Sequence, residues 1–178
     1  VGEMGSILRF DGTTWMPMTS NTVRTLIAIW GAKATTSTSA TTIVAAGAAG
    51  TVQRYDGSDW QAAPNTPLNG LTLRGVWTSG TRTVAVGINS SSMAVIATTE
   101  AAGWNTQTAS PMYLQSVWGV ADDNIYAVGA GGTIMQFDGA RWMPMTSGTQ
   151  QPLQAVSGTT TNVYVVGNVG TILRLGVN

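Results

Sequence analysis

The sequence has 178 residues, of which 43% are apolar and 9% are charged, and its eight acidic and eight basic side chains give zero net charge. A chain of this length can bury one core, but its charge offers no basic field that would attract nucleic acid or an anionic membrane. It contains no Cys and no His, which excludes disulfides, thiolate chemistry and the commonest general base and metal ligand.

The first predicted element introduces a repeat. Residues 9–20 read RFDGTTWMPMTS and residues 136–147 read QFDGARWMPMTS, so nine of twelve positions are identical. The same unit opens with a Gly-x-x-Gly pair each time it appears. Its copies are GEMGSILRFDGTTW from Gly2, GAAGTVQRYDGSDW from Gly47, GAGGTIMQFDGARW from Gly129 and the shortened GNVGTILRL from Gly167.

A second phrase also recurs four times along the chain. It reads LIAIWG at 26–31, LRGVWT at 73–78, LQSVWG at 114–119 and LQAVSG at 153–158. A short β-rich run comes next and closes on a glycine, and these closing glycines are Gly47, Gly87, Gly129 and Gly167. They are 40, 42 and 38 residues apart, and Gly47 lies 45 residues after Gly2.

Each unit contains four short runs of β-branched, aromatic or alternating character, separated by turn signals such as Asp-Gly and Pro. Four strands at a period near 40 residues indicate one blade of a β-propeller. A β-sandwich is the competing all-β fold, but a sandwich needs no such period. We therefore predict an all-β propeller of four-stranded antiparallel blades, with repeats at about 2–46, 47–86, 87–128 and 129–166 and an extra strand in 167–178.

The phrases VGAGGTIMQFDGARW and LQSVWGVADDNIYAVG resemble the repeats of secreted bacterial β-propellers of the kelch-like and BNR-like type. The resemblance covers nearly the whole chain and implies an exported binding or scaffold module. Asp-Gly-x-x-Trp also resembles the Asp-box of sialidase-type propellers. It differs because Asp11 and Gly12 are adjacent, whereas that box has one residue between them.

Four tryptophans recur once per unit, at Trp15, Trp60, Trp104 and Trp142. A flat indole can stack on the apolar face of a sugar, so these four residues are the candidate ligand-binding set. The alternative is that each pins its strand against a neighbouring strand or blade. A second set, formed by Trp30, Trp77 and Trp118, is expected to serve packing.

The recurring polar residues have structural alternatives too. Asp11, Asp56 and Asp138 precede glycine, and Asp-Gly is a strong hairpin signal, so we expect turns there. Arg9, Arg54 and Arg174 share one strand position and either line a groove for an anionic ligand or pair locally. A calcium site at Asp122–Asn124 has no support beyond its acids, and we expect no metal and no cofactor.

Glycoside hydrolysis needs two facing carboxylates, and Ser or Thr nucleophiles here have no His to activate them. We therefore expect no enzymatic activity. The polar positions are filled by Ser, Thr and Gly rather than by charge, which favours an extracellular or cell-surface location. No apolar run is long enough for a membrane span.

Seventeen predicted strands are one too many for four blades, because the last strand repeats the phase of the first. The sequence begins at Val1 and stops in mid-unit, so we expect a segment of a larger propeller. Two alternatives are a displaced terminal strand and a strand that completes a neighbouring molecule. We expect the interaction surface at the irregular segments 32–42 and 88–100 and at the two terminal strands.

The sequence thus predicts a non-enzymatic extracellular binding or scaffold module, with a glycan as the expected small partner. The alternative is a structural surface or assembly protein that associates with copies of itself through its terminal strands.

Overall fold

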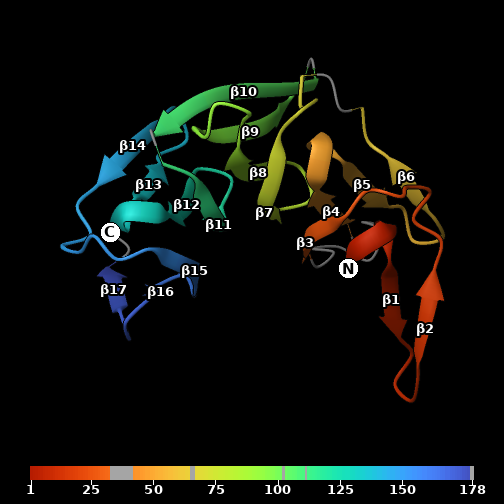
Figure 1. Cartoon of the computed structure of the whole chain (residues 1–178). Coiled ribbons are helices and arrows are strands. Elements are labelled where there is room, and N and C mark those ends of the chain that lie inside the picture. The colour runs from red at the N-terminus through yellow and green to blue at the C-terminus, as the bar shows by residue number, and fades with distance from the viewer. Residues whose placement is uncertain (33–41, 65–66, 102, 111, 177–178) are drawn as a thin grey trace.

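The structure is a computed structural model that describes residues 1–32, 42–64, 67–101, 103–110 and 112–176. Antiparallel strands make up nearly all of its regular structure (Figure 1). The helices among these residues are three short 3-10 turns: η1 (Glu3–Gly5), η2 (Ala48–Gly50) and η3 (Ala130–Gly132). The predicted all-β architecture is confirmed.

The strands of the described residues form five separate sheets, each made of consecutive strands. Two strands form the first sheet, four strands form each of the next three, and three strands form the last. The sheets are β1 (Ile7–Phe10) and β2 (Trp15–Met18); β3 (Leu26–Ala32), β4 (Thr42–Gly47), β5 (Val52–Tyr55) and β6 (Trp60–Ala62); β7 (Thr72–Thr78), β8 (Thr83–Ile88), β9 (Ala94–Glu100) and β10 (Gly103–Ser110); β11 (Leu114–Ala121), β12 (Asn124–Gly129), β13 (Ile134–Phe137) and β14 (Trp142–Met145); and β15 (Leu153–Gly158), β16 (Asn162–Gly167) and β17 (Ile172–Gly176).

The five sheets follow one another around an open arc, with the β1–β2 hairpin at one end and the β15–β17 sheet at the other (Figure 1). The first strands of the last four sheets contact one another, in the order β3, β7, β11 and β15. This is the inner position of a propeller blade. The sheets are therefore blades, and the ring that they follow is not closed.

The blades take their strands across the boundaries of the sequence repeats. In the fourth sheet, for example, β11 and β12 come from the end of the repeat 87–128, and β13 and β14 come from the start of the repeat 129–166. Strands are numbered here from the inner strand of a blade outward. β1 and β2 are then a third and a fourth strand, the next twelve strands form three complete blades, and β15–β17 are a first, second and third strand.

The closing glycines of the repeat sit where two backbones touch. A Cβ placed on Gly47 would lie 2.0 Å from the carbonyl oxygen of Thr25, and one on Gly87 would lie 2.0 Å from that of Thr72. The backbone is extended at Gly47 and Gly129, both with φ −171°, so the constraint there is space rather than conformation. In the Gly-x-x-Gly turn the left-handed conformation belongs to the second glycine and to the residue before it, as at Ala49 (φ 55°) and Gly50 (φ 72°).

Hydrophobic side chains fill the spaces between blades. Inner-strand residues Leu73, Leu114 and Leu153 are at most 1% exposed. The small residue in the middle of each inner strand permits this approach, because a Cβ on Gly75 would lie 3.0 Å from the Cα of Ser116. Trp77 packs against Gly119 of the next inner strand, where a Cβ would lie 2.7 Å from the indole ring. The packing role predicted for Trp77 is therefore its role in this structure.

Candidate functional site

The four recurring tryptophans lie at the start of the outermost strand of their blades, but their environments differ. Trp15 is 66% exposed, Trp60 is 2% exposed, and Trp104 and Trp142 are half-buried. Trp15, Trp60 and Trp142 each contact an aromatic ring across the hairpin, with ring centroids 5.2, 5.3 and 5.4 Å apart. Trp104 instead lies opposite Thr99.

Trp60, Trp104 and Trp142 each lie against the preceding blade. Trp60 packs in a cluster with Ile7, Leu26 and Ala45, and so it presents no free ring face to a ligand. For Trp60 the packing alternative describes the structure, and a sugar-stacking role does not fit. Trp15 has no preceding blade among the described residues and lies on the open end of the arc.

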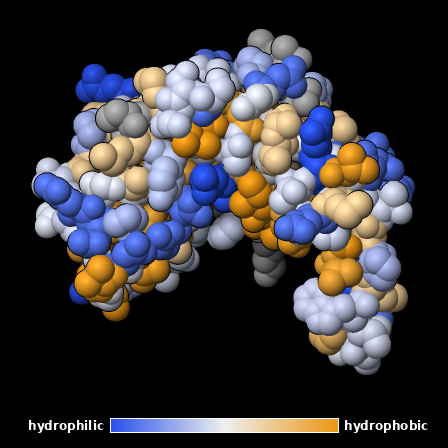
Figure 2. Space-filling model, viewed as in Figure 1, coloured by the Kyte–Doolittle hydropathy of each residue, from blue (hydrophilic) through white to orange (hydrophobic). Residues whose placement is uncertain are grey.

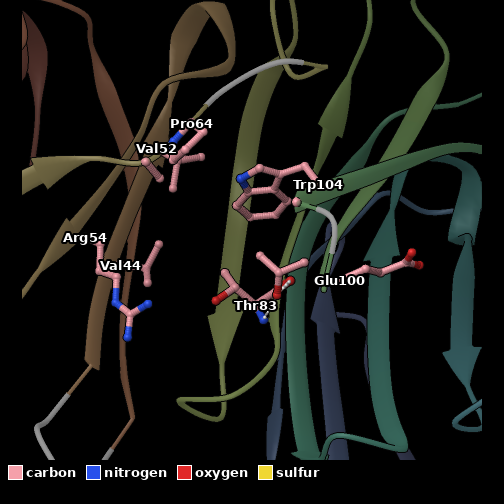
Figure 3. A pocket seen from close by; sticks show the side chains of 10 residues that line it. Val44, Val52, Arg54, Pro64, Thr83, Glu100 and Trp104 are labelled. Carbon is pink, nitrogen blue, oxygen red and sulfur yellow. Dashed lines mark hydrogen bonds between the residues drawn. The ribbon is translucent and has the colours of Figure 1, made fainter.

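A cleft lies in front of Trp104, between the second and third sheets (Figure 3). We name it the Trp104 cleft, and its volume is about 350 Å³. The indole of Trp104 points between the blades, and Arg54 of β5 lines the facing wall, with its guanidinium directed away from the indole (Figure 3). Its walls are formed by Val44, Val52, Arg54, Ala63, Pro64, Thr83, Thr99, Glu100, Gly103 and Trp104.

Thr99 stands beside Trp104 where two other blades have an aromatic residue. In the second and fourth blades Tyr55 and Phe137 occupy the position beside the tryptophan. A threonine there leaves part of the indole of Trp104 uncovered. Arg54 has no hydrogen-bond or ion-pair partner among the described residues, so its charge is available to a ligand.

An equivalent cleft lies in front of Trp142, between the third and fourth sheets. We name it the Trp142 cleft, and its volume is about 500 Å³. Its walls are more polar, and they include Thr98, Asn105, Gln107 and Arg141. The guanidinium carbon of Arg82 lies 5.1 Å from the centroid of the Phe137 ring, which itself contacts Trp142. A stack of one cation and two aromatic rings thus runs along this cleft.

The β9–β10 hairpin separates the two clefts, and Thr99 and Glu100 line both. In Figure 3 the Glu100 carboxylate points away from Trp104, and its Oε1 accepts a hydrogen bond from Asn105 Nδ2 at 3.1 Å. Residues 98–100 belong to the irregular segment 88–100 in which the sequence predicts interaction surface. Most of the other such segment, 32–42, lies outside the described residues.

The strand-position arginines do not act as one group. Arg54 lines the Trp104 cleft, whereas Arg174 Nε donates a hydrogen bond to Asn162 Oδ1 at 2.7 Å. Arg9 is exposed on the first sheet. Of the three equivalent arginines that the sequence singled out, Arg54 is the one that lines the Trp104 cleft. The sequence did not predict Arg82 as a cleft residue. Nothing in the repeat distinguishes this turn residue, and its role is visible only from its contact with Phe137.

The three repeated aspartates form turns, but not two-residue turns. Each stands at the start of a four-residue loop, as in the link from Tyr55 to Trp60. Asp56 Oδ1 accepts hydrogen bonds from the backbone N–H groups of Ser58 and Asp59, both at 2.8 Å. Asp11 and Asp138 accept equivalent pairs of bonds at 2.8–2.9 Å. The turn prediction agrees with this geometry.

These backbone donors hold the pKa of each of the three carboxyl groups below its ordinary value of 3.8. In Asp138 the nearby Arg141 guanidinium lowers the pKa further. A carboxyl group whose pKa is lower in the folded state stabilises the fold above its unfolded-state pKa, and that contribution disappears as the pH falls through the folded-state value.

We therefore expect acid to destabilise the protein in part through these turns. Replacing Asp11, Asp56 and Asp138 together by Asn should make the urea midpoint depend less on pH below about pH 4, because the amide oxygen still accepts hydrogen bonds but carries no charge. At neutral pH the triple variant should be less stable than the wild type. A matched Asp123→Asn change, in the β11–β12 turn, controls for the loss of an exposed carboxylate elsewhere on the surface. An unchanged limb in the triple variant would contradict this reasoning.

In the described part of the chain, no three Asp and Glu side chains gather as a metal ion would require. Asp122 links two blades, because its Oδ2 accepts a hydrogen bond of 2.6 Å from Thr81 Oγ1 of the preceding blade. A helix long and apolar enough to cross a membrane is not found among the described residues.

The sequence matches no protein-family model. One curated protein, "Immune protein Tsi7" from Pseudomonas aeruginosa, is 41% identical over 61 residues, which are 34% of this chain and 20% of that protein. Among solved structures, "YCF48 bound to D1 peptide" has a TM-score of 0.70 at 13% sequence identity, and the match covers 99% of this chain and 59% of that chain.

A fungal lectin from Aleuria aurantia, described as a six-bladed β-propeller with fucose recognition, has a TM-score of 0.49 at 12% identity over 98% of this chain and 71% of that chain. The chain spans only part of each of these proteins. The sheets and the structural likeness together show that the chain has the blades of a β-propeller.

Proposed function

We propose that the chain is a non-enzymatic binding module that takes up a glycan in the Trp104 and Trp142 clefts. The proposal places the module outside the cell, and it is supported there by the low charge of the chain and its abundance of Ser and Thr. The observation that carries it is the recurrence of one cleft, in front of an accessible tryptophan, at two neighbouring blade interfaces.

The chemistry of the clefts suits a sugar. An indole with a free face can cover the apolar face of a pyranose ring, and neighbouring hydroxyl, amide and guanidinium groups can bond its hydroxyls. The Trp104 cleft supplies the indole with Thr83 and Arg54, and the Trp142 cleft supplies Asn105 and Gln107. Since Thr99 and Glu100 border both clefts, two residues of one extended glycan can occupy them together.

The absence of catalysis is part of the proposal. Glu100 is the single carboxylate that lines either cleft among the described residues, whereas hydrolysis of a glycosidic bond uses a pair. Glu100 is exposed, so burial does not prepare it to act as a general acid.

A glycan array followed by titration tests the proposal. For a glycan that binds, Trp104→Ala and Trp142→Ala should each weaken affinity by roughly tenfold or more, which corresponds to losing about 1.4 kcal/mol of contact energy. Trp15→Ala is the matched control, because Trp15 has the same place in its hairpin but lies outside both clefts, and it should leave affinity unchanged.

Thermal unfolding of each variant separates loss of binding from loss of structure, since Trp104 and Trp142 also pack against the hydrophobic clusters. Arg54→Gln provides a second test that leaves the core intact. The proposal is wrong if no glycan binds, or if binding survives both cleft substitutions in proteins that remain folded.

A further inference from the structure

A polar side chain is buried without a partner between the first and second sheets. Gln53 of β5 is 2% exposed, and its Oε1 accepts no hydrogen bond among the described residues. The first sheet has Leu8 at this position of the repeat, and the third, fourth and fifth sheets have Ala97, Met135 and Leu173. Gln53 therefore places an amide where the other sheets have an apolar side chain.

Such an amide destabilises the fold unless something bonds to it. A buried acceptor has given up its hydrogen bond to water, and without a new donor it recovers nothing. Any of the apolar residues found at this position in the other sheets would avoid that cost. A donor supplied from outside the chain would account for the glutamine.

A cleft beside Gln53 gives such a donor access. We name it the Gln53 cleft, and its volume of about 420 Å³ lies in the range typical of small-molecule sites. Figure 2 shows polar residues among hydrophobic ones on the surface where the first two sheets meet. The polar side chains in its wall are Asn21, Thr22, Arg24, Thr51, Gln53 and Asn69.

The side chain of Gln53 is directed toward this space. Gln53 lies opposite Ala45 in the β4–β5 pair, and opposed residues of paired strands share a face of the sheet. Ala45 belongs to a cluster with Ile7 of the first sheet, so that face is turned toward the first sheet. The loop after β2, which carries Asn21 and Arg24, forms the facing wall. Asn21 Nδ2 donates a hydrogen bond to the carbonyl oxygen of Trp60 at 3.1 Å and so fixes this loop to β6.

Thr51 offers a second group to a ligand. In two turns of the same kind the threonine hydroxyl is used within the turn, because Thr133 Oγ1 donates to the carbonyl oxygen of Ala130 at 2.7 Å and Thr171 Oγ1 donates to that of Asn168 at 2.8 Å. Thr51 is 9% exposed, and its hydroxyl makes no hydrogen bond among the described residues. Two buried polar groups of one cleft are thus left without partners.

The charge of the wall indicates what else the ligand carries. Arg24 is the single ionisable side chain that lines the cleft among the described residues, and its guanidinium has no ion pair or hydrogen bond there. A guanidinium binds a carboxylate through two parallel hydrogen bonds. No carboxylate of the described wall opposes an anion. The wall also has no aromatic ring, so a ligand here is held by hydrogen bonds and charge rather than by stacking.

We propose that the Gln53 cleft is a further binding site, for a small hydroxylated carboxylate of the size of a sugar acid. A hydroxyl of the ligand donates to Gln53 Oε1, another bonds with the hydroxyl of Thr51, and the carboxylate meets Arg24 at the rim. The cleft shares Val52 and Ala63 with the Trp104 cleft but none of its polar residues. The site therefore does not rest on the proposed function.

Calorimetric titration with glucuronate, galacturonate and gluconate is the first test, with glucose as the probe that lacks the carboxylate. At least one of the three acids should bind, and glucose should bind several-fold more weakly. That difference should shrink as salt is added, because Arg24 is exposed. If none of the acids binds, or if glucose binds as tightly as they do, the proposal is overturned.

Gln53→Met separates a binding role from a structural one, because it installs the residue that the fourth sheet has at this position. It should weaken binding of the acid by tenfold or more. It should also raise the urea midpoint, since it removes the unpaired buried amide. If binding survives this change, or if the midpoint falls, the amide serves the fold and the proposal is wrong.

Two arginine variants locate the bound acid. Arg24→Gln should weaken binding without changing the urea midpoint. Arg54→Gln is the matched control, because Arg54 is also exposed but lines the neighbouring Trp104 cleft, and it should leave binding of the acid unchanged. If Arg54→Gln weakens binding and Arg24→Gln does not, the acid occupies the Trp104 cleft. That result would overturn this site while leaving the proposed glycan binding intact.

Discussion

Replacing Gly87 by alanine should destabilise the protein by more than about 3 kcal/mol in the free energy of unfolding, or prevent folding altogether. The added Cβ would lie 2.0 Å from the carbonyl oxygen of Thr72 and 3.0 Å from the Cα of Leu73. Both are backbone atoms, so no rotation of a side chain can relieve the overlap. Gly87 lies in β8, the second strand of the middle blade, and it pairs with Leu73 of β7 and Val95 of β9. A shift of the backbone at Gly87 would therefore disturb both pairings.

Urea unfolding followed by circular dichroism measures this effect. Gly31→Ala is the matched control, because Gly31 also lies within a strand and its added Cβ would make only an ordinary contact of 3.6 Å with Ile43. The control should change the free energy of unfolding by less than about 1 kcal/mol, since alanine adds no strain there. Equal effects of the two changes would mean that the close backbone approach is not what the glycine provides.

Replacing Ile125 by alanine should cost about 2–5 kcal/mol of unfolding free energy. Ile125 is fully buried in β12, in the large cluster that joins the third, fourth and fifth sheets. Truncation removes three carbons from a packed interior, and the strands on either side, β11 and β13, restrict how far the cavity can collapse. The measurement is the urea midpoint together with the slope of the transition.

Ile27→Ala gives the contrast within the same repeat scaffold. Ile27 is 42% exposed on β3, and the equivalent residues of the next three blades are Arg74, Gln115 and Gln154. Because the side chain of Ile27 is already partly in water and the equivalent residues of the other blades are polar, truncation should cost less than about 1 kcal/mol. If the two isoleucines prove equally costly, burial between blades is not the main source of stability.

The repeat made the strands predictable because each blade must solve the same packing problem. Leu73, Leu114 and Leu153 return at one position of the inner strand because each of them fills the space between two blades. The division of strands into sheets was not predictable from the repeat, since a period has no natural beginning. Only the structure shows that Gly47 closes the second strand of a blade rather than ending a blade.

The tryptophans show where sequence reasoning reached its limit. Trp15, Trp60 and Trp104 occupy one position of the repeat, yet their exposure depends on what lies on the preceding blade and across the hairpin. Trp15 has no preceding blade among the described residues, whereas Trp104 lies opposite Thr99 and borders a cleft. The change from an aromatic residue to threonine is visible in the sequence, but it acquires meaning only when the register of β9 and β10 is known.

Every sheet is made of strands that are consecutive in the chain, and this has a consequence for how the molecule forms. Each hairpin and each blade can assemble from contacts between near neighbours in sequence, so little chain has to be gathered from afar before contacts begin to form. Structure can begin in any complete blade and spread outward one interface at a time, as in other repeat architectures. The blades flanked on both sides then gain stability from two neighbours, whereas the outermost strands gain it from one. The connectivity of the sheets therefore favours folding by local steps, one blade interface after another.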